Sequence, residues 1–148
     1  AYEKIAASPW FYKGWFTQNY SISSSTCDRS HPWLSTEEMS DVINAYLIQN
    51  KSGVDNGRIT PVTTNCWGGN PYSIGEIRDL AAGVGGGIVS SISNVAVTYN
   101  NDGKTANITF STNRGDIAIG GADFKQIFNL RAPGYISIKS QLYNIERK

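Results

Sequence analysis

The hydrophobic positions of this chain follow a helical period in the first half and a period of two from about residue 88 onward. The first helical set comprises Met39, Val42, Ile43, Tyr46 and Leu47. Because residues three and four apart share one face of a helix, this set predicts a helix with one buried face. Ser35 and Glu38 have the spacing of a capping box, which places the start of the helix at Ser35.

A second, shorter helix is predicted by the same kind of signal. Ser73 and Glu76 again have capping-box spacing, and Gly83 provides the end of the helix. The apolar face consists of Ile74, Ile77, Leu80 and Ala81. The loop between the two helices carries an aromatic residue, Trp67, beside two glycines.

The period of two predicts β-strands in the second half of the chain. The alternating apolar positions are Val95, Val97 and Tyr99, then Ala106, Ile108 and Phe110, then Ile117 and Ile119. Turn residues separate these three runs at 100–103 and 113–115. The pattern therefore predicts a hairpin followed by a third antiparallel strand.

The end of the chain predicts a helix that folds back across this sheet. A glycine corner at Gly120–Gly121 precedes a helical set over 122–129, and Pro133-Gly134 supplies a reversal before one or two closing strands that include Ile145. We expect one core from both segments, made of Phe110, Ile117, Ile119, Phe124, Phe128, Ile136, Ile138 and Leu142.

These elements indicate the α+β class, with an antiparallel sheet and two or three short helices packed on it. The chain of 148 residues fits a single domain or subdomain. We divide it into an irregular aromatic-rich segment over 1–35, two helices over 36–83, and a sheet with one short helix over 88–146.

Composition narrows the class of protein. Hydrophobic residues make up 40% of the chain, charged residues only 17%, and the formal net charge is +1. No basic stripe exists that would bind phosphates, so nucleic acid is not an expected partner. No apolar run approaches the roughly 20 residues of a membrane span. Abundant Asn, Ser, Thr, Gly and Tyr favour a secreted protein, extracellular or in the cell envelope.

The chain has two cysteines, Cys27 and Cys66, and one histidine, His31. A disulfide between the cysteines fits an oxidising compartment, and two unpaired buried thiols are the alternative. The C-x-x-x-H spacing of Cys27 and His31 is compatible with a zinc site in which Cys66 is a third ligand. Zinc sites have three or four ligands with closer paired spacing. We therefore expect His31 to order a loop, and no metal or cofactor.

No group of residues has the pattern of a catalytic site. The acidic residues Glu37 and Glu38 lie in the first turn of a predicted helix, where negative charge interacts favourably with the helix dipole. Glu76 is expected to cap the second helix together with Ser73. No G-x-S-x-G elbow accompanies the single histidine. We expect this chain alone not to be catalytic.

Aromatic residues are the remaining candidates for binding. Four tryptophans and eight tyrosines are many for this length. Such rings either stack on sugars or form a satellite core under a long loop. The candidate ligand-binding residues, from the 10–33 and 65–72 loops, are Trp67, Asn70, Tyr72, Trp33 and His31.

The second half of the chain resembles the C-terminal half of the stage II sporulation protein D-like domain family. The motifs are NNDGKTANITFSTNRG for the hairpin, IGGADFKQIFNL for the corner and helix, and IKSQLYNI for the closing strand. Tyr143 stands where the family often has Phe, and Lys125 where it often has Arg. The segment SHPWLSTEEMSDVINAYL resembles the Trp-plus-helix stretch that precedes the family's sheet.

This resemblance implies a bacterial protein of the cell envelope that acts on peptidoglycan, either a lytic transglycosylase or an amidase enhancer. The family's catalytic glutamate belongs to an upstream helix that nothing in this chain matches, and its H-x-x-x-G-G pair is also missing. The expected partners are peptidoglycan or another glycan, and an upstream segment of the same parent protein. The alternatives are a non-catalytic extracellular module that binds glycan or protein, and a structural module of an extracellular assembly.

Overall fold

The computed structural model describes residues 10–14, 33–62, 68–134 and 136–147. Its helices are α2 (Thr36–Ile48), the short 3-10 helix η2 (Asn56–Arg58), α4 (Ile74–Ala82) and α5 (Gly121–Arg131). Its strands are β1 (Trp10–Gly14), β2 (Trp33–Leu34), β3 (Ile92–Tyr99), β4 (Thr105–Thr112), β5 (Gly115–Gly120) and β6 (Tyr143–Arg147). The α+β class and the antiparallel pairing predicted from the sequence are confirmed.

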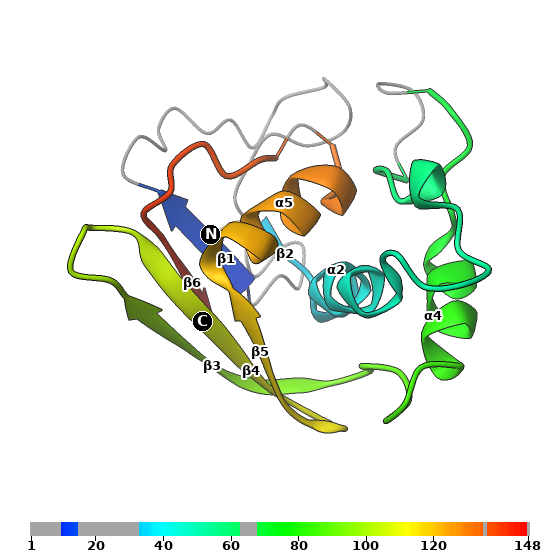
Figure 1. Cartoon of the computed structure of the whole chain (residues 1–148), viewed down its shortest axis with the longest axis horizontal. Coiled ribbons are helices and arrows are strands. Elements are labelled where there is room, and N and C mark those ends of the chain that lie inside the picture. The colour runs from blue at the N-terminus through cyan, green and yellow to red at the C-terminus, as the bar shows by residue number, and fades with distance from the viewer. Residues whose placement is uncertain (1–9, 15–32, 63–67, 135, 148) are drawn as a thin grey trace.

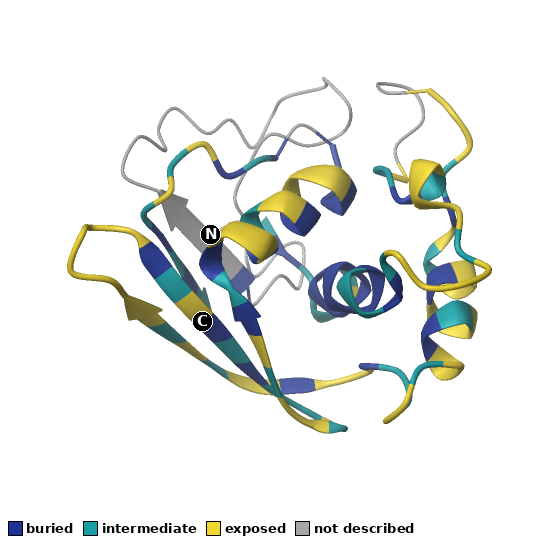
Figure 2. Ribbon diagram, in the orientation of Figure 1, coloured by how far each residue is buried: buried dark blue, intermediate teal, exposed yellow. Residues whose placement is uncertain are grey.

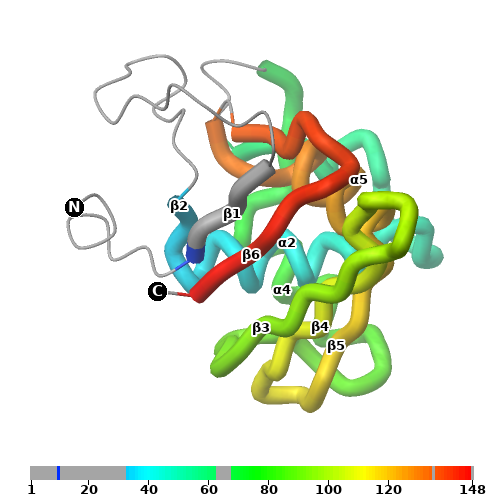
Figure 3. The backbone as a smooth tube through the Cα atoms, turned by 90° about the vertical axis from the view of Figure 1, so that its left-hand side faces the viewer, coloured from blue at the N-terminus to red at the C-terminus, as the bar shows by residue number. Residues whose placement is uncertain are grey.

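The strands form two three-stranded antiparallel sheets. One has the order β3-β4-β5, which is the predicted hairpin plus the third strand. The other has the order β2-β1-β6, and Figure 3 shows β1 running between β2 and β6. Strands from the start and the end of the chain thus pair directly, with Trp10 opposite Arg147 and Gly14 opposite Tyr143.

Both predicted capping boxes are present. In α2 the Ser35 hydroxyl accepts a hydrogen bond from the Glu38 backbone N–H, and the Glu38 carboxylate accepts one from the Ser35 backbone. Ser73 and Glu76 make the same reciprocal pair at the start of α4. Each box satisfies two backbone donors that a helix start leaves free, which explains why both helices begin where the sequence indicates.

Helix α2 is buried around more of its circumference than one apolar face would require (Figure 2). It contacts both α4 and α5, and Figure 1 shows it end-on between α4 and the sheets. Its buried residues accordingly include three polar ones, namely Ser40, Asp41 and Asn44. The hydrophobic pattern could not indicate these, because polar residues ordinarily mark the exposed face of a helix.

The core is organised around a chain of aromatic rings. Phe110 of β4 lies 6.1 Å from Trp10 and 5.6 Å from Phe124, measured between ring centroids. Phe124 in turn lies 5.8 Å from Phe128 and 6.3 Å from Tyr143. All five rings are buried, so α5 packs on both sheets through its phenylalanines.

Most of the predicted core residues are in this cluster. Ile136 and Ile138 are buried with Phe110, and Ile117 packs against them half-buried. Leu142 is the exception, because it is half-buried just before β6 begins. The alternation of β6 instead turns Tyr143 into the core.

The glycine corner before α5 has a steric cause. A Cβ atom on Gly121 would overlap the backbone carbonyl of Thr105 at the start of β4. The Gly121 carbonyl also accepts a hydrogen bond from the buried Tyr143 hydroxyl. Burial raises the pKa of that hydroxyl above its ordinary range, so it stays a donor. The corner therefore joins α5, β4 and β6 at one point.

Candidate functional site

Two of the predicted binding residues, Asn70 and Tyr72, lie around Arg58. The Arg58 Nε donates to the Asn70 carbonyl at 3.0 Å, and its guanidinium carbon lies 4.1 Å from the centroid of the Tyr72 ring. Tyr72 is buried, and its hydroxyl accepts a hydrogen bond from the Asp55 N–H. Its ring thus packs inside the fold under a cation, while Asn70 is exposed.

Of the other predicted residues, the structure describes Trp33 alone. Trp33 is half-buried in β2, where it pairs with Phe11. Trp67, His31, Cys27 and Cys66 lie outside the described residues. The disulfide between the two cysteines stays a prediction.

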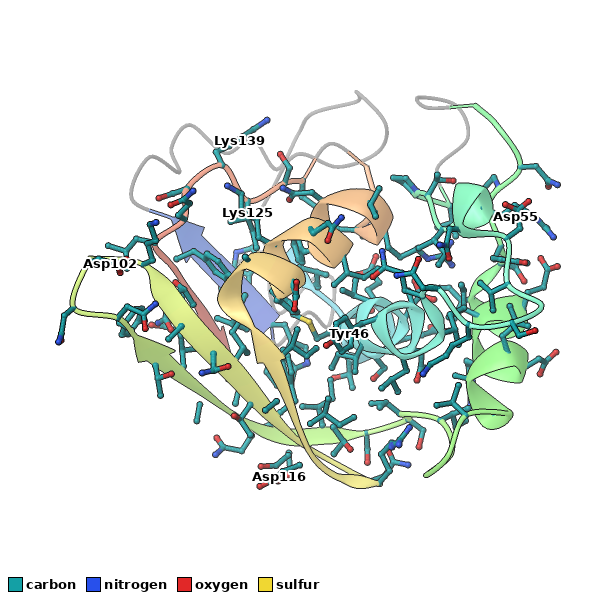
Figure 4. The ribbon with its side chains drawn as sticks, in the orientation of Figure 1. Tyr46, Asp55, Asp102, Asp116, Lys125 and Lys139 are labelled. Carbon is teal, nitrogen blue, oxygen red and sulfur yellow. The ribbon has the colours of Figure 1, made fainter. Side chains whose placement is uncertain are left out.

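An open polar groove lies between the end of α2 and the start of α5, with a volume of about 670 Å³. We call it the amide groove, because four of its nine lining residues carry side-chain amides. Its lining residues are Tyr46, Leu47, Gln49, Asn50, Lys51, Asn56, Val84, Asp123 and Gln126. Figure 4 shows Tyr46 on the side of α2 that faces α5. One aromatic ring and several amides therefore share one open surface.

The amides of Asn50 and Asn56 are held in place by each other. The Asn56 Nδ2 donates to the Asn50 Oδ1 at 2.6 Å, and the Asn56 Oδ1 accepts from the Asn50 backbone N–H at 3.1 Å. Asn50 has a φ of 64°, the left-handed conformation that Asn tolerates better than most residues. This pair fixes one wall of the amide groove before any ligand arrives.

A second, smaller pocket lies between α2, α4 and the segment that leads into β3, with a volume of about 280 Å³. We call it the α2–α4 pocket. Its lining residues are Thr36, Glu37, Ser40, Asp41, Asn44, Ile74, Arg78, Val89 and Ser90. The side-chain amide of Asn44 is engaged on both sides, since it donates to the Val89 carbonyl and accepts from the Val89 N–H.

Asp41, at the wall of this pocket, forms a buried ion pair with Arg131 of α5. The Arg131 Nε donates to Asp41 Oδ2 at 2.7 Å and Nη2 donates to Oδ1 at 3.2 Å. The Arg131 Nη1 donates to the carbonyls of Thr60 and Tyr72, at 2.9 and 2.6 Å. This planar two-bond geometry is the one in which a buried pair offsets its desolvation.

Burial raises the pKa of the Asp41 carboxyl above its ordinary value, while the bond to Arg131 lowers it. The nearby Glu37 and Glu38 carboxylates act with burial to raise it. A raised pKa in a pocket is one mark of a general acid. Here both carboxylate oxygens are held by Arg131, so the geometry favours a structural role for Asp41 over proton transfer.

Ser40 has a buried hydroxyl that makes no hydrogen bond to the described part of the chain. The residue is 5% exposed, and its Oγ is the buried side-chain atom without a partner there. A buried polar atom in this state costs free energy, typically about 1–3 kcal/mol.

We therefore expect Ser40→Ala to raise the free energy of unfolding by about 1 kcal/mol, since alanine removes the unmatched hydroxyl and favours the helix. Urea unfolding of the two proteins measures this. A variant less stable than the wild type would contradict it and indicate that the hydroxyl has a partner in solution.

Two further classes of site are not found in the described residues. No group of three or more His, Cys, Asp or Glu side chains there could hold a metal ion. None of the described helices has the length and apolar composition that crossing a bilayer requires.

The sequence does not mark as functional the residues that line the amide groove and the α2–α4 pocket. Asn50 and Asn56 belong to a turn that looks like an ordinary helix end, and Asp41 and Arg131 are 90 positions apart. The sequence signal for the first pair is an Asn on each side of the glycine-containing turn after α2. The ion pair has no local signal.

No protein-family model matches this chain, and no match was found among curated proteins or solved structures.

Proposed function

We propose that this chain is a non-catalytic, glycan-binding part of a cell-envelope protein that acts on peptidoglycan, and that it holds the glycan in the amide groove. The observation that carries the proposal is the meeting of the Tyr46 ring with the amides of Gln49, Asn50, Asn56 and Gln126 in one open groove.

The chemistry of these groups suits a sugar. The face of an aromatic ring packs against the C–H face of a pyranose, while amides donate to and accept from its hydroxyl and acetamido groups. The Asn50–Asn56 pair reduces the ordering cost of binding, because these side chains already hold one geometry. The groove volume of about 670 Å³ lies within the usual range for ligand sites.

The resemblance to the stage II sporulation protein D-like family supports peptidoglycan as the source of the glycan. The family's catalytic glutamate segment has no counterpart in this sequence. The one buried carboxylate of the described residues, Asp41, is engaged by Arg131 and does not line the groove. Binding without cleavage is therefore the function that we assign to the chain.

The test is a titration of the ¹⁵N-labelled protein with an N-acetylglucosamine trimer, followed by NMR. We expect shifts confined to residues 46–51, 56 and 123–126. Tyr46→Ala should weaken binding about fivefold, because an aromatic contact is worth about 1 kcal/mol.

The matched control is Tyr99→Ala, since Tyr99 is 50% exposed on β3 and does not line the groove. It should leave the affinity unchanged. Shifts scattered over the surface, or equal affinities for the two folded tyrosine variants, would overturn the proposed groove.

A further inference from the structure

The α2–α4 pocket carries two opposite charges on two different helices. Glu37 comes from α2 and Arg78 from α4, and both side chains are exposed at the pocket. No ion pair within the described residues involves either of them. The other charged group of the lining, Asp41, is already neutralised by Arg131. The pocket therefore presents one available anion and one available cation.

Ser40 adds an unmatched polar group to the same wall. It is 5% exposed, and its Oγ has no hydrogen-bond partner in the described structure. Asn44 beside it is satisfied on both sides by Val89. Buried polar atoms are ordinarily paired, so an unpaired hydroxyl in a pocket wall points to a ligand that pairs with it.

The remaining lining consists of two aliphatic residues, Ile74 and Val89, and two residues with hydroxyls, Thr36 and Ser90. Ile74 and Val89 contribute aliphatic surface. The volume of about 280 Å³ is just below the roughly 300 Å³ at which sites for drug-sized molecules begin. The pocket therefore suits a compact ligand with a short aliphatic group.

From these features we propose that the α2–α4 pocket binds the zwitterion of a small aliphatic α-amino acid. Arg78 binds the carboxylate, Glu37 binds the ammonium group, and the Ser40 hydroxyl hydrogen-bonds to the same head group. Ile74 and Val89 contact the side chain. A neutral zwitterion matches the balance of one free anion and one free cation, whereas a ligand with a single charge leaves one of them without a partner. This site is separate from the amide groove.

The experiment is an NMR titration of the whole chain with L-valine, D-valine, N-acetyl-L-valine and L-valinamide. The last two each lack one charge of the zwitterion. We expect L- or D-valine to shift the resonances of residues 36–44, 74–78 and 89–90. Each single-charge analogue should bind about three- to fivefold more weakly, because it forms one exposed ion pair fewer, which is worth up to about 1 kcal/mol.

Two variants assign the charges. Glu37→Gln should bind valine and N-acetylvaline equally, since it lacks the carboxylate that binds the ammonium group. Arg78→Gln should bind valine and valinamide equally for the converse reason. Lys125→Gln, on α5 and outside the pocket lining, is the control that should keep the preference for valine.

Ser40→Ala supplies a readout that a merely structural serine would not move. It should weaken valine binding while raising the melting temperature of the free protein. Equal binding of valine and both analogues to the wild type, or no shift at the pocket, would overturn the proposal. None of these variants lines the amide groove, so binding of the N-acetylglucosamine trimer should be unaffected and the two proposals can fail separately.

Discussion

Arg131→Met should lower the free energy of unfolding by about 3–5 kcal/mol, a large part of the stability of a domain of this size. Arg131 is 1% exposed and donates to both oxygens of Asp41 and to two backbone carbonyls. Methionine fills a similar volume but leaves the buried carboxylate without a partner. Urea unfolding followed by circular dichroism measures the loss.

The loss should depend on pH in a defined direction. Burial raises the pKa of Asp41 and Arg131 opposes that rise, so the pKa in the variant lies further above that of the unfolded chain. A folded state with the higher pKa binds the proton more tightly, so its free energy of unfolding increases as the pH falls toward that pKa. The difference between wild type and variant should be smaller at about pH 5 than at about pH 7.

Arg78→Met is the matched control, because Arg78 is an exposed helical arginine that forms none of the ion pairs of the described residues. Its stability should stay within about 0.5 kcal/mol of the wild type at both pH values. If Arg131→Met cost no more than Arg78→Met, the buried ion pair would not hold α2 and α5 together.

Phe124→Ala should cost about 3–5 kcal/mol, since it removes a large buried side chain and leaves a cavity. Phe124 is fully buried, and its ring contacts Phe110, Phe128 and Tyr143. The same unfolding measurement checks this, with Lys104→Ala in the exposed turn between β3 and β4 as the control. An unchanged melting temperature for Phe124→Ala would contradict the arrangement of α5 across the sheets.

The parts of the fold that the sequence predicts are those fixed by local interactions. Ser35 with Glu38 and Ser73 with Glu76 are three residues apart, and their hydrogen bonds form within a single helical turn. The alternation that gives β3, β4 and β5 is likewise visible in short runs of sequence. Helix α5 follows from the spacing of its phenylalanines.

The parts that the sequence does not predict depend on residues far apart in the chain. Strand β1 has five residues, rich in aromatics, and no alternation of polar and apolar positions marks it as a strand. It becomes one because it pairs with β6, which lies more than 100 residues later in the sequence. Asp41 can be buried because Arg131, from another helix, forms a hydrogen-bonded ion pair with it. A pattern of polar and apolar residues cannot reveal such a partner.

The sequence likewise predicts only part of the candidate site. The sequence predicts binding by aromatic rings and neighbouring amides, but one of the predicted rings, Tyr72, is packed under Arg58 inside the fold. The helical pattern predicts Tyr46 on the buried face of its helix, whereas the residue is half-buried and lines the amide groove. Asn56, which lines the same groove, comes from a separate turn, so only the three-dimensional arrangement places the two residues in one site.

The most direct test of binding without cleavage is incubation of the chain with purified peptidoglycan sacculi. After centrifugation, our account predicts that the protein is found with the sacculi, that Tyr46→Ala reduces the bound fraction, and that no soluble muropeptides are released. Release of muropeptides, or wild-type protein left entirely in the supernatant, would contradict it.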